Sequence, residues 1–284
     1  MKPKSPETNR QTYREAAKSG DVDAQYCLAC HYDFVSPKNR RAAIHWYQKA
    51  AQQGHPEAQN FLGESYRDGW SVEKNRKIEN SWFKKAAAQG QADAQCSLGY
   101  TYFYGEGLKG DQKEALRWYR RSPSNGNKAA MSNIAAMYRE GHVVKQSWSM
   151  AIRWYRKAAE AGHMPAMHCL GRIYDGLEEF PQQLDKAVYW LKKAADAGDA
   201  QSQGTLGTHY FNGEGVRRNR RLAAKLYRQS AEQDDTWSQY LLGLCYRDGS
   251  GVWRNKRWAL YWFDQAATDT PEATKAAKSL REIR

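Results

Sequence analysis

The sequence contains no apolar run long enough to cross a membrane, and its mean hydropathy is −0.91. The first ten residues, MKPKSPETNR, are polar and lack the apolar stretch of a secretory signal peptide. Cysteine occurs at only five positions, an odd number that favours reduced thiols over a disulfide framework. We therefore expect a cytoplasmic protein that does not insert into a membrane.

Catalytic motifs are also missing from the sequence. No His-Glu-x-x-His, Gly-x-Ser-x-Gly or phosphate-loop pattern is present. Gly213-Glu214-Gly215 is a fragment of a glycine-rich loop, but the same pattern occurs at Gly105-Glu106-Gly107 and is a turn of the repeat described below. We therefore predict that the protein is not an enzyme and that it holds no cofactor and no metal.

Aromatic residues are abundant for so polar a chain, with 11 Trp and 18 Tyr, and they recur at a fixed interval. The recurring tryptophans are separated by 36 residues or a multiple of 36, and an aromatic residue follows most of them: Trp46, Trp82, Trp118, Trp154, Trp190 and Trp262. A Leu-Gly pair and a tyrosine four residues after the leucine recur at nearly the same step, as at Leu98 and Tyr102. The chain is therefore a repeat array.

Each repeat has the pattern of two helices. In residues 91–127, Ala94, Leu98 and Tyr102 are spaced four apart and share one helical face. A Gly-x-Gly turn ends this helix, and Asp111 stands where the next helix needs an N-cap. We expect the Leu-Gly glycine to let the paired helices approach closely and the recurring tryptophan to fill the core between pairs. A single pair cannot bury its apolar face, but stacked pairs can.

The repeated pattern A-x-A-Q-x-x-L-G-x-x-Y-x-x-G-x-G-V, followed by K-A-x-x-W-Y-x-K-A-A-x-x-G, resembles the Sel-1-like repeat family, which is related to the tetratricopeptide repeats. This resemblance implies an all-α fold, a right-handed α-solenoid of about seven 36-residue helix-turn-helix repeats with terminal capping helices. It also implies that the first helices of the repeats line a concave groove. The turns in DFVSPKNRR and DGLEEFPQQ depart from the pattern, so we expect those loops to differ in shape.

The expected boundaries follow from the repeat markers. A flexible N-terminus covers residues 1–11, an N-terminal half-repeat covers 12–21, and a capping helix covers 271–284. The solenoid extends to residue 270, and its repeats are placed near 22–55, 56–91, 92–127, 128–163, 164–199, 200–235 and 236–270.

The stretch CLACH, residues 27–31, has the Cys-x-x-Cys-His spacing of a c-type haem attachment site. It falls on the first helix of the first repeat, where later repeats hold unrelated residues at the same positions, such as Phe61 and Glu64. We therefore interpret CLACH as ordinary repeat helix without haem, and three ligands on one helix do not complete a zinc site.

The binding site is predicted where the repeats vary. One stripe on the first helices lies away from the packed face, so a partner can select its side chains. Exposed aromatic residues and arginines are typical anchors of protein interfaces. The predicted groove residues are Tyr26, Asn60, Glu64, Arg67, Tyr100, Phe103, Arg139, His168, Arg172, Phe211, Tyr240, Leu244 and Arg247.

The net charge is +13 and is spread along the chain, but two clusters at turns into second helices form a predicted basic edge. Its residues are Arg217, Arg218, Arg220, Arg221, Arg254, Lys256 and Arg257. We expect a non-catalytic scaffold or adaptor that binds another protein, one with an acidic surface or segment, in the concave groove. An immunity protein that neutralises a toxin is one alternative. A nucleic-acid-binding protein that uses the basic edge is a disfavoured second alternative, because no nucleic-acid module is visible.

Overall fold

The computed structural model describes residues 13–34, 39–122, 126–176 and 180–282. The flexible N-terminus predicted for residues 1–11 and parts of the two atypical loops lie outside these ranges. The chain divides into two compact units, Met1–Ser147 and Trp148–Arg284. The described residues form sixteen helical segments and no strand, which confirms the predicted all-α repeat fold.

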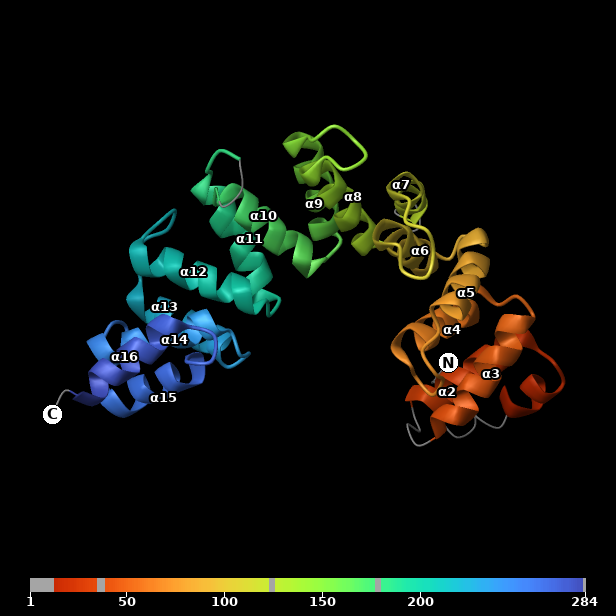
Figure 1. Cartoon of the computed structure of the whole chain (residues 1–284), viewed down its shortest axis with the longest axis horizontal. Helices are drawn as coiled ribbons and strands as arrows, with labels where there is room; N and C mark the ends of the chain where they lie inside the picture. Colours follow the sequence, from red (N-terminus) through yellow and green to blue (C-terminus); the bar gives the residue numbers. More distant parts are fainter. Residues whose placement is uncertain (1–12, 35–38, 123–125, 177–179, 283–284) are drawn as a thin grey trace, which may run out of the picture. The chain divides into compact units, whose positions relative to one another are not determined.

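The helices follow one another as first and second helices of successive repeats. Within each unit, a first helix lies against the second helix that follows it, as α4 and α5 do in one unit and α14 and α15 in the other (Figure 1). The first unit opens with a short helical stretch at 13–18. It continues with α2 (Val22–Phe34), α3 (Arg40–Gln52), α4 (Pro56–Asp68), α5 (Arg76–Ala88), α6 (Ala92–Tyr104), α7 (Gln112–Arg121) and α8 (Lys128–Glu140).

The second unit has the same alternation, and its last described helix is α16. Its helices are α9 (Trp148–Glu160), α10 (Met164–Tyr174), α11 (Leu184–Asp196), α12 (Ala200–Asn212), α13 (Arg220–Ala231), α14 (Thr236–Asp248), α15 (Lys256–Ala266) and α16 (Pro271–Glu282). The described part of the chain contains no helix that is both long enough and apolar enough to span a membrane.

Local sequence sets where the helices begin and end. The Asp111 carboxylate accepts hydrogen bonds from the backbone N–H groups of Lys113 and Glu114, at 2.9 and 3.1 Å, and so caps α7. Gly105 ends α6 with φ of 73°, a left-handed conformation that residues with a side chain adopt at a cost. The repeat pattern therefore encodes its own helix boundaries.

The glycine of each Leu-Gly pair allows close contact between the paired helices, as predicted. A Cβ atom placed on Gly63 would lie 2.5 Å from the Phe83 ring of α5. A Cβ atom placed on Gly99 would lie 2.7 Å from the Tyr119 ring, and one placed on Gly243 would lie 2.5 Å from the Phe263 ring. These aromatic rings are at most 2% exposed, so each fills the core of its pair.

Three of the recurring tryptophans, Trp46, Trp82 and Trp118, pack against core clusters as predicted, but they are less deeply buried than expected. Trp118 and Trp154, like Trp46 and Trp82, are only half-buried, and the residue after each of them is the fully buried one. A basic side chain three residues later lies over the indole ring: Lys49 over Trp46, Lys85 over Trp82, Arg121 over Trp118 and Lys157 over Trp154. Trp190 and Trp262 alone among the recurring tryptophans are buried, at 6% and 8% exposure.

A buried glutamine joins five of the first helices, α2, α4, α6, α12 and α14, to the preceding repeat. The Gln59 side-chain amide donates a 3.0 Å hydrogen bond to the carbonyl oxygen of Ala51, and its own oxygen accepts one of 2.8 Å from Gln89. Gln25, Gln95, Gln203 and Gln239 donate to equivalent carbonyls. Because these carbonyls lie near the ends of helices, the glutamines satisfy groups that a helix cannot satisfy itself.

Candidate functional site

An aromatic cluster lies on the first-helix face of the first unit, on α6. The ring centroids of Tyr100 and Tyr104 are 4.5 Å apart, and those of Phe103 and Tyr104 are 4.9 Å apart. Tyr100 is 44% exposed and Tyr104 is 61% exposed. Such exposure of neighbouring aromatic rings is costly in water unless a partner covers them.

The cluster borders a small hollow between α6 and α8. Residues of both first helices line this hollow, and the first helices α4 and α6 of neighbouring repeats contact each other. The hollow measures about 90 Å³, and Asn133, Ala136 and Glu140 line its other side. Beneath it lies the Tyr119 ring, and burial raises the pKa of this phenol well above its ordinary value. The site therefore combines apolar rings, an amide and one carboxylate, which suits a protein segment.

The aromatic cluster replaces an ion pair that other repeats place at the same positions. Arg67 is bonded to Asp68 at 3.0 Å and Arg247 to Asp248 at 2.7 Å, and Arg139 pairs likewise with Glu140. In the third repeat the same two positions are Phe103 and Tyr104. Sequence reasoning missed Tyr104, although this exchange of an Arg-acid dipeptide for two aromatic residues was a visible signal.

These ion pairs reduce the availability of the predicted arginines for an acidic partner. The hydrogen bond from Arg67 holds the pKa of Asp68 below its ordinary value, and Arg247 has the same effect on the pKa of Asp248. An acidic partner would have to compete with these carboxylates for the guanidinium groups. Arg172 on α10 is exposed.

Other predicted groove residues of the first unit are held by internal contacts. Asn60 is 7% exposed and donates to Glu64 at 3.2 Å, so the expectation that its side chain is free for a partner is wrong. Burial raises the pKa of the half-buried Glu64 carboxyl group. Tyr26 is half-buried and stacks on His55, with centroids 4.3 Å apart.

In the second unit, the predicted groove residues also serve the fold. His168 contacts Ser202 at 2.9 Å and Asp199 at 3.0 Å, and so ties α10 to the start of α12. Tyr240 and Leu244 are half-buried against the cluster that joins α15 to α16, which corrects the expectation that they are exposed. Phe211 is half-buried beneath Arg220, whose guanidinium carbon is 5.4 Å from the ring centroid.

The predicted basic edge lies at the loops that lead into α13 and α15, and all seven of its side chains are exposed. The structure brings the start of α13 beside the loop before α15, because Arg221 of α13 and Gly251 and Val252 of that loop line the same hollows. Trp253 and Trp258 lie among these basic residues, and the sequence reading gave them no role.

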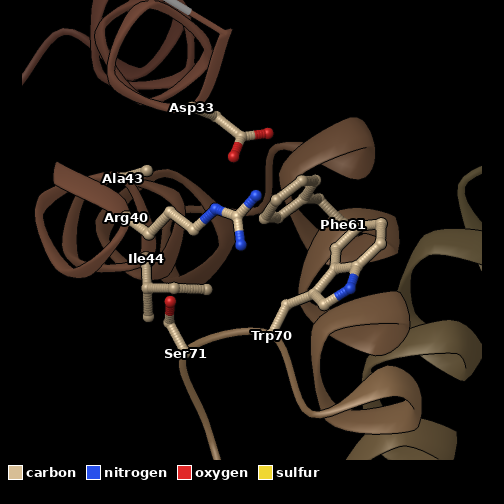
Figure 2. A pocket seen from close by; sticks show the side chains of 7 residues that line it. All are labelled: Asp33, Arg40, Ala43, Ile44, Phe61, Trp70 and Ser71. Atoms are coloured by element: carbon tan, nitrogen blue, oxygen red, sulfur yellow. The ribbon is translucent and has the colours of Figure 1, made fainter. Parts of the chain in front are cut away.

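A second hollow of the first unit, of about 230 Å³, lies where α2, α3 and the turn after α4 meet. Figure 2 shows the Arg40 guanidinium group between the Asp33 carboxylate and the Phe61 ring, with Trp70 beside it. Residues 35–38, which connect Asp33 with Arg40 in the chain, lie outside the described ranges.

The CLACH stretch belongs to α2, as predicted from its place in the repeat. The Tyr47 hydroxyl donates to the Cys30 sulfur at 3.3 Å, and Cys27 and Cys30 are half-buried free thiols. Across the described residues, no three His, Cys, Asp or Glu side chains come close enough together to hold a metal ion.

A family model of the Sel1 repeat matches most of the chain. This model matches seven segments of the chain: 22–55, 56–91, 92–127, 128–163, 165–199, 200–235 and 238–269. The chain belongs to the Sel1 repeat family. Proteins built from Sel1 repeats are generally scaffolds for interactions with other proteins.

Solved structures of Sel1 repeat proteins resemble this chain over almost its whole length. A Sel1 repeat protein from Oxalobacter formigenes is 27% identical with a TM-score of 0.77, and the match covers 98% of this chain and 82% of that one. A protective antigen of uropathogenic Escherichia coli, also 27% identical, has a TM-score of 0.55, with 97% and 68% of the two chains covered. No curated protein matches the sequence significantly.

An immunity protein from Pseudomonas aeruginosa is a more remote match. It is 18% identical with a TM-score of 0.46, and the match covers 73% of this chain and 81% of that one.

Proposed function

We propose that this Sel1 repeat protein is a non-catalytic scaffold that binds a segment of a partner protein on its first-helix face. The observation that carries the proposal is the exposed cluster of Tyr100, Phe103 and Tyr104 beside the hollow between α6 and α8. Aromatic residues in such positions are typical hot spots of protein interfaces, and the surrounding polar groups supply specificity.

The chemistry of the site defines the segment that it accepts. An apolar or aromatic side chain of the partner enters the hollow against Ala136, and the Asn133 amide and the Glu140 carboxylate offer hydrogen bonds at its edge. Acidic groups of the partner engage Arg67 and Arg139 by displacing Asp68 and Glu140 from their ion pairs. These arginines then affect the rate of association and its salt dependence more than the affinity.

A toxin is one candidate for the partner, in which case the scaffold acts as an immunity protein. The aromatic cluster does not distinguish this role from that of an adaptor, because both require only a protein surface that covers the rings. The identity of the captured partner decides between them.

The first experiment places a photo-crosslinking amino acid at Tyr104 in the source cells. The control positions are Tyr189 of α11 and Tyr261 of α15, which are 52% and 47% exposed but lie on second helices. We expect one discrete partner to crosslink from Tyr104 and not from either control. Equal crosslinking from all three positions would contradict a defined site.

The second experiment measures the affinity of the captured partner for variants. Tyr100→Ala with Phe103→Ala should weaken binding by about 2 kcal/mol or more, as loss of central aromatic anchors does. Tyr261→Ala should bind like wild type. If the double variant binds like wild type while charge reversal at Arg218 and Arg221 abolishes binding, the partner uses the basic edge and the proposed surface is wrong.

A further inference from the structure

Two adjoining hollows in the last two repeats form an open trough on the second unit. They measure about 830 and 450 Å³ and share Arg221, Arg228, Gly251 and Val252. Volumes of several hundred Å³ are typical of sites for small molecules and chain segments. The trough runs from α13, across the loop before α15, to the start of α15.

Three aromatic rings line the trough. The Trp253 side chain is 94% exposed and that of Trp258 is 49% exposed. The Tyr246 and Trp258 rings are nearly parallel, with an interplanar angle of 24° and centroids 6.1 Å apart. The trough thus presents flat π surfaces that face solvent.

The two tryptophans are peculiar to the last repeat. Where Trp253 stands, repeats two to six carry only charged residues or proline: Glu73, Lys109, Lys145, Pro181 and Arg217. Where Trp258 stands, the same repeats carry Ile78, Glu114, Met150, Lys186 and Leu222. The repeat fold therefore forms without these indoles, and a ligand is a physical reason for placing them in water.

Positive charge lines the other wall of the trough. Arg221, Lys225 and Arg228 follow one another along the exposed face of α13, within about 10 Å of helix. Residues 216–258 hold ten Lys and Arg and four Asp and Glu, and no carboxylate lines either hollow. Two of those four acids are used elsewhere, since Asp235 caps α14 and Asp248 pairs with Arg247.

We propose that this trough binds single-stranded nucleic acid, with bases stacked on Trp253 and Trp258 and the phosphates held by Arg221, Lys225 and Arg228. Stacking platforms beside a basic groove are how proteins hold single strands without reading their sequence. An acidic peptide would satisfy the cations but offers no flat partner for an indole as exposed as Trp253. A duplex would satisfy the cations as well, but its bases are stacked on one another inside the helix.

The experiment titrates the full-length protein with fluorescein-labelled twelve-residue oligo-uridine and oligo-thymidine and follows anisotropy over a series of salt concentrations. We expect Trp253→Ala to weaken binding about tenfold or more, the effect of losing one stacked base. Arg221→Gln with Lys225→Gln should weaken binding and lower the slope of log affinity against log salt by about 1.4, since each cation contributes about 0.7 on a single strand. Trp237→Ala is the matched control, because Trp237 is 52% exposed and lies outside the trough.

Several results would overturn the proposal. The first is that the oligonucleotide does not bind at low salt, and the second is that Trp237→Ala and Trp253→Ala lower its affinity equally. The third is that a duplex of the same length binds more tightly than the single strand. The fourth is that poly-glutamate at equal charge displaces the oligonucleotide fully. The last result would assign the trough to an acidic protein segment. Tyr100→Ala with Phe103→Ala should leave oligonucleotide binding unchanged. A negative result for the trough therefore does not bear on the proposed partner-binding surface on α6.

Discussion

The Phe83 ring lies against Gly63 so closely that a Cβ atom on the glycine would be 2.5 Å from the ring carbons. This contact joins α4 to α5, and its equivalents join other helix pairs of the array. Phe83 is fully buried, so the ring has little room to retreat.

Gly63→Ala should therefore destabilise the first unit by about 1–3 kcal/mol, the usual cost of overpacking a core. Urea denaturation followed by circular dichroism measures the change. Lys84→Ala, at the exposed position next to Phe83, is the control and should change the midpoint little. An unchanged midpoint for Gly63→Ala would show that the two helices can move apart without lowering the stability of the fold.

The two aromatic residues of the third repeat's second helix should differ in their contribution to stability. Tyr119 is 2% exposed and contacts Gly99, so Tyr119→Ala should cost about 3–5 kcal/mol. Trp118 is half-buried beneath Arg121, so Trp118→Ala should cost less, even though it removes the larger side chain. Denaturation midpoints of the two variants test this order. The reverse order would show that Trp118, and not Tyr119, is the main core residue of this helix.

Stability should depend on pH through His209. Burial alone lowers the pKa of this imidazole, but hydrogen bonds to the Asp175 carboxylate at 3.2 Å and to the Glu214 carbonyl at 3.0 Å outweigh burial and raise it. A raised pKa in the folded state means that His209 stabilises the fold fully below about pH 6.5, the ordinary pKa of histidine. This stabilisation is lost as the pH rises through the folded-state pKa.

The corresponding measurement compares unfolding midpoints of wild type and His209→Gln at about pH 5.5 and about pH 8.5. The difference in unfolding midpoint between wild type and the variant should be larger at the lower pH. Asp175→Asn should remove the same pH dependence, because it removes the partner that favours the charged ring. A gap that is constant with pH would contradict the assignment.

The thiols should react in two groups. Burial raises the pKa of Cys96 and of Cys245 to about 12, so little thiolate forms at neutral pH and both should react slowly with a thiol reagent in the native protein. In denaturant without reductant, all five cysteines should react, since all five are thiols. Fewer than five reactive thiols would reveal a disulfide, and Cys96→Ala with Cys245→Ala should remove the slow phase.

Much of the fold was predictable because a repeat presents the same evidence seven times. The helix pairs, the caps such as Asp111, and the close approach at Gly63 follow from local preferences and from spacing along one helix. The sequence could not decide between Trp118 and Tyr119 as the core residue. Adjacent residues point about 100° apart on a helix, and both directions belong to the apolar side.

For the candidate sites, too, some features follow from the sequence and others only from the tertiary structure. Periodicity alone placed Tyr100 and Phe103 on the first-helix face and determined that the basic residues sit at turns. Only the tertiary structure decided that Asn60 is buried, that Leu244 packs against the cluster joining α15 to α16, and that Arg67 is already paired. It also brought Trp253 and Trp258 beside Arg221 and Lys225 of the preceding repeat. These outcomes depend on contacts between helices, and spacing within a helix carries no information about them.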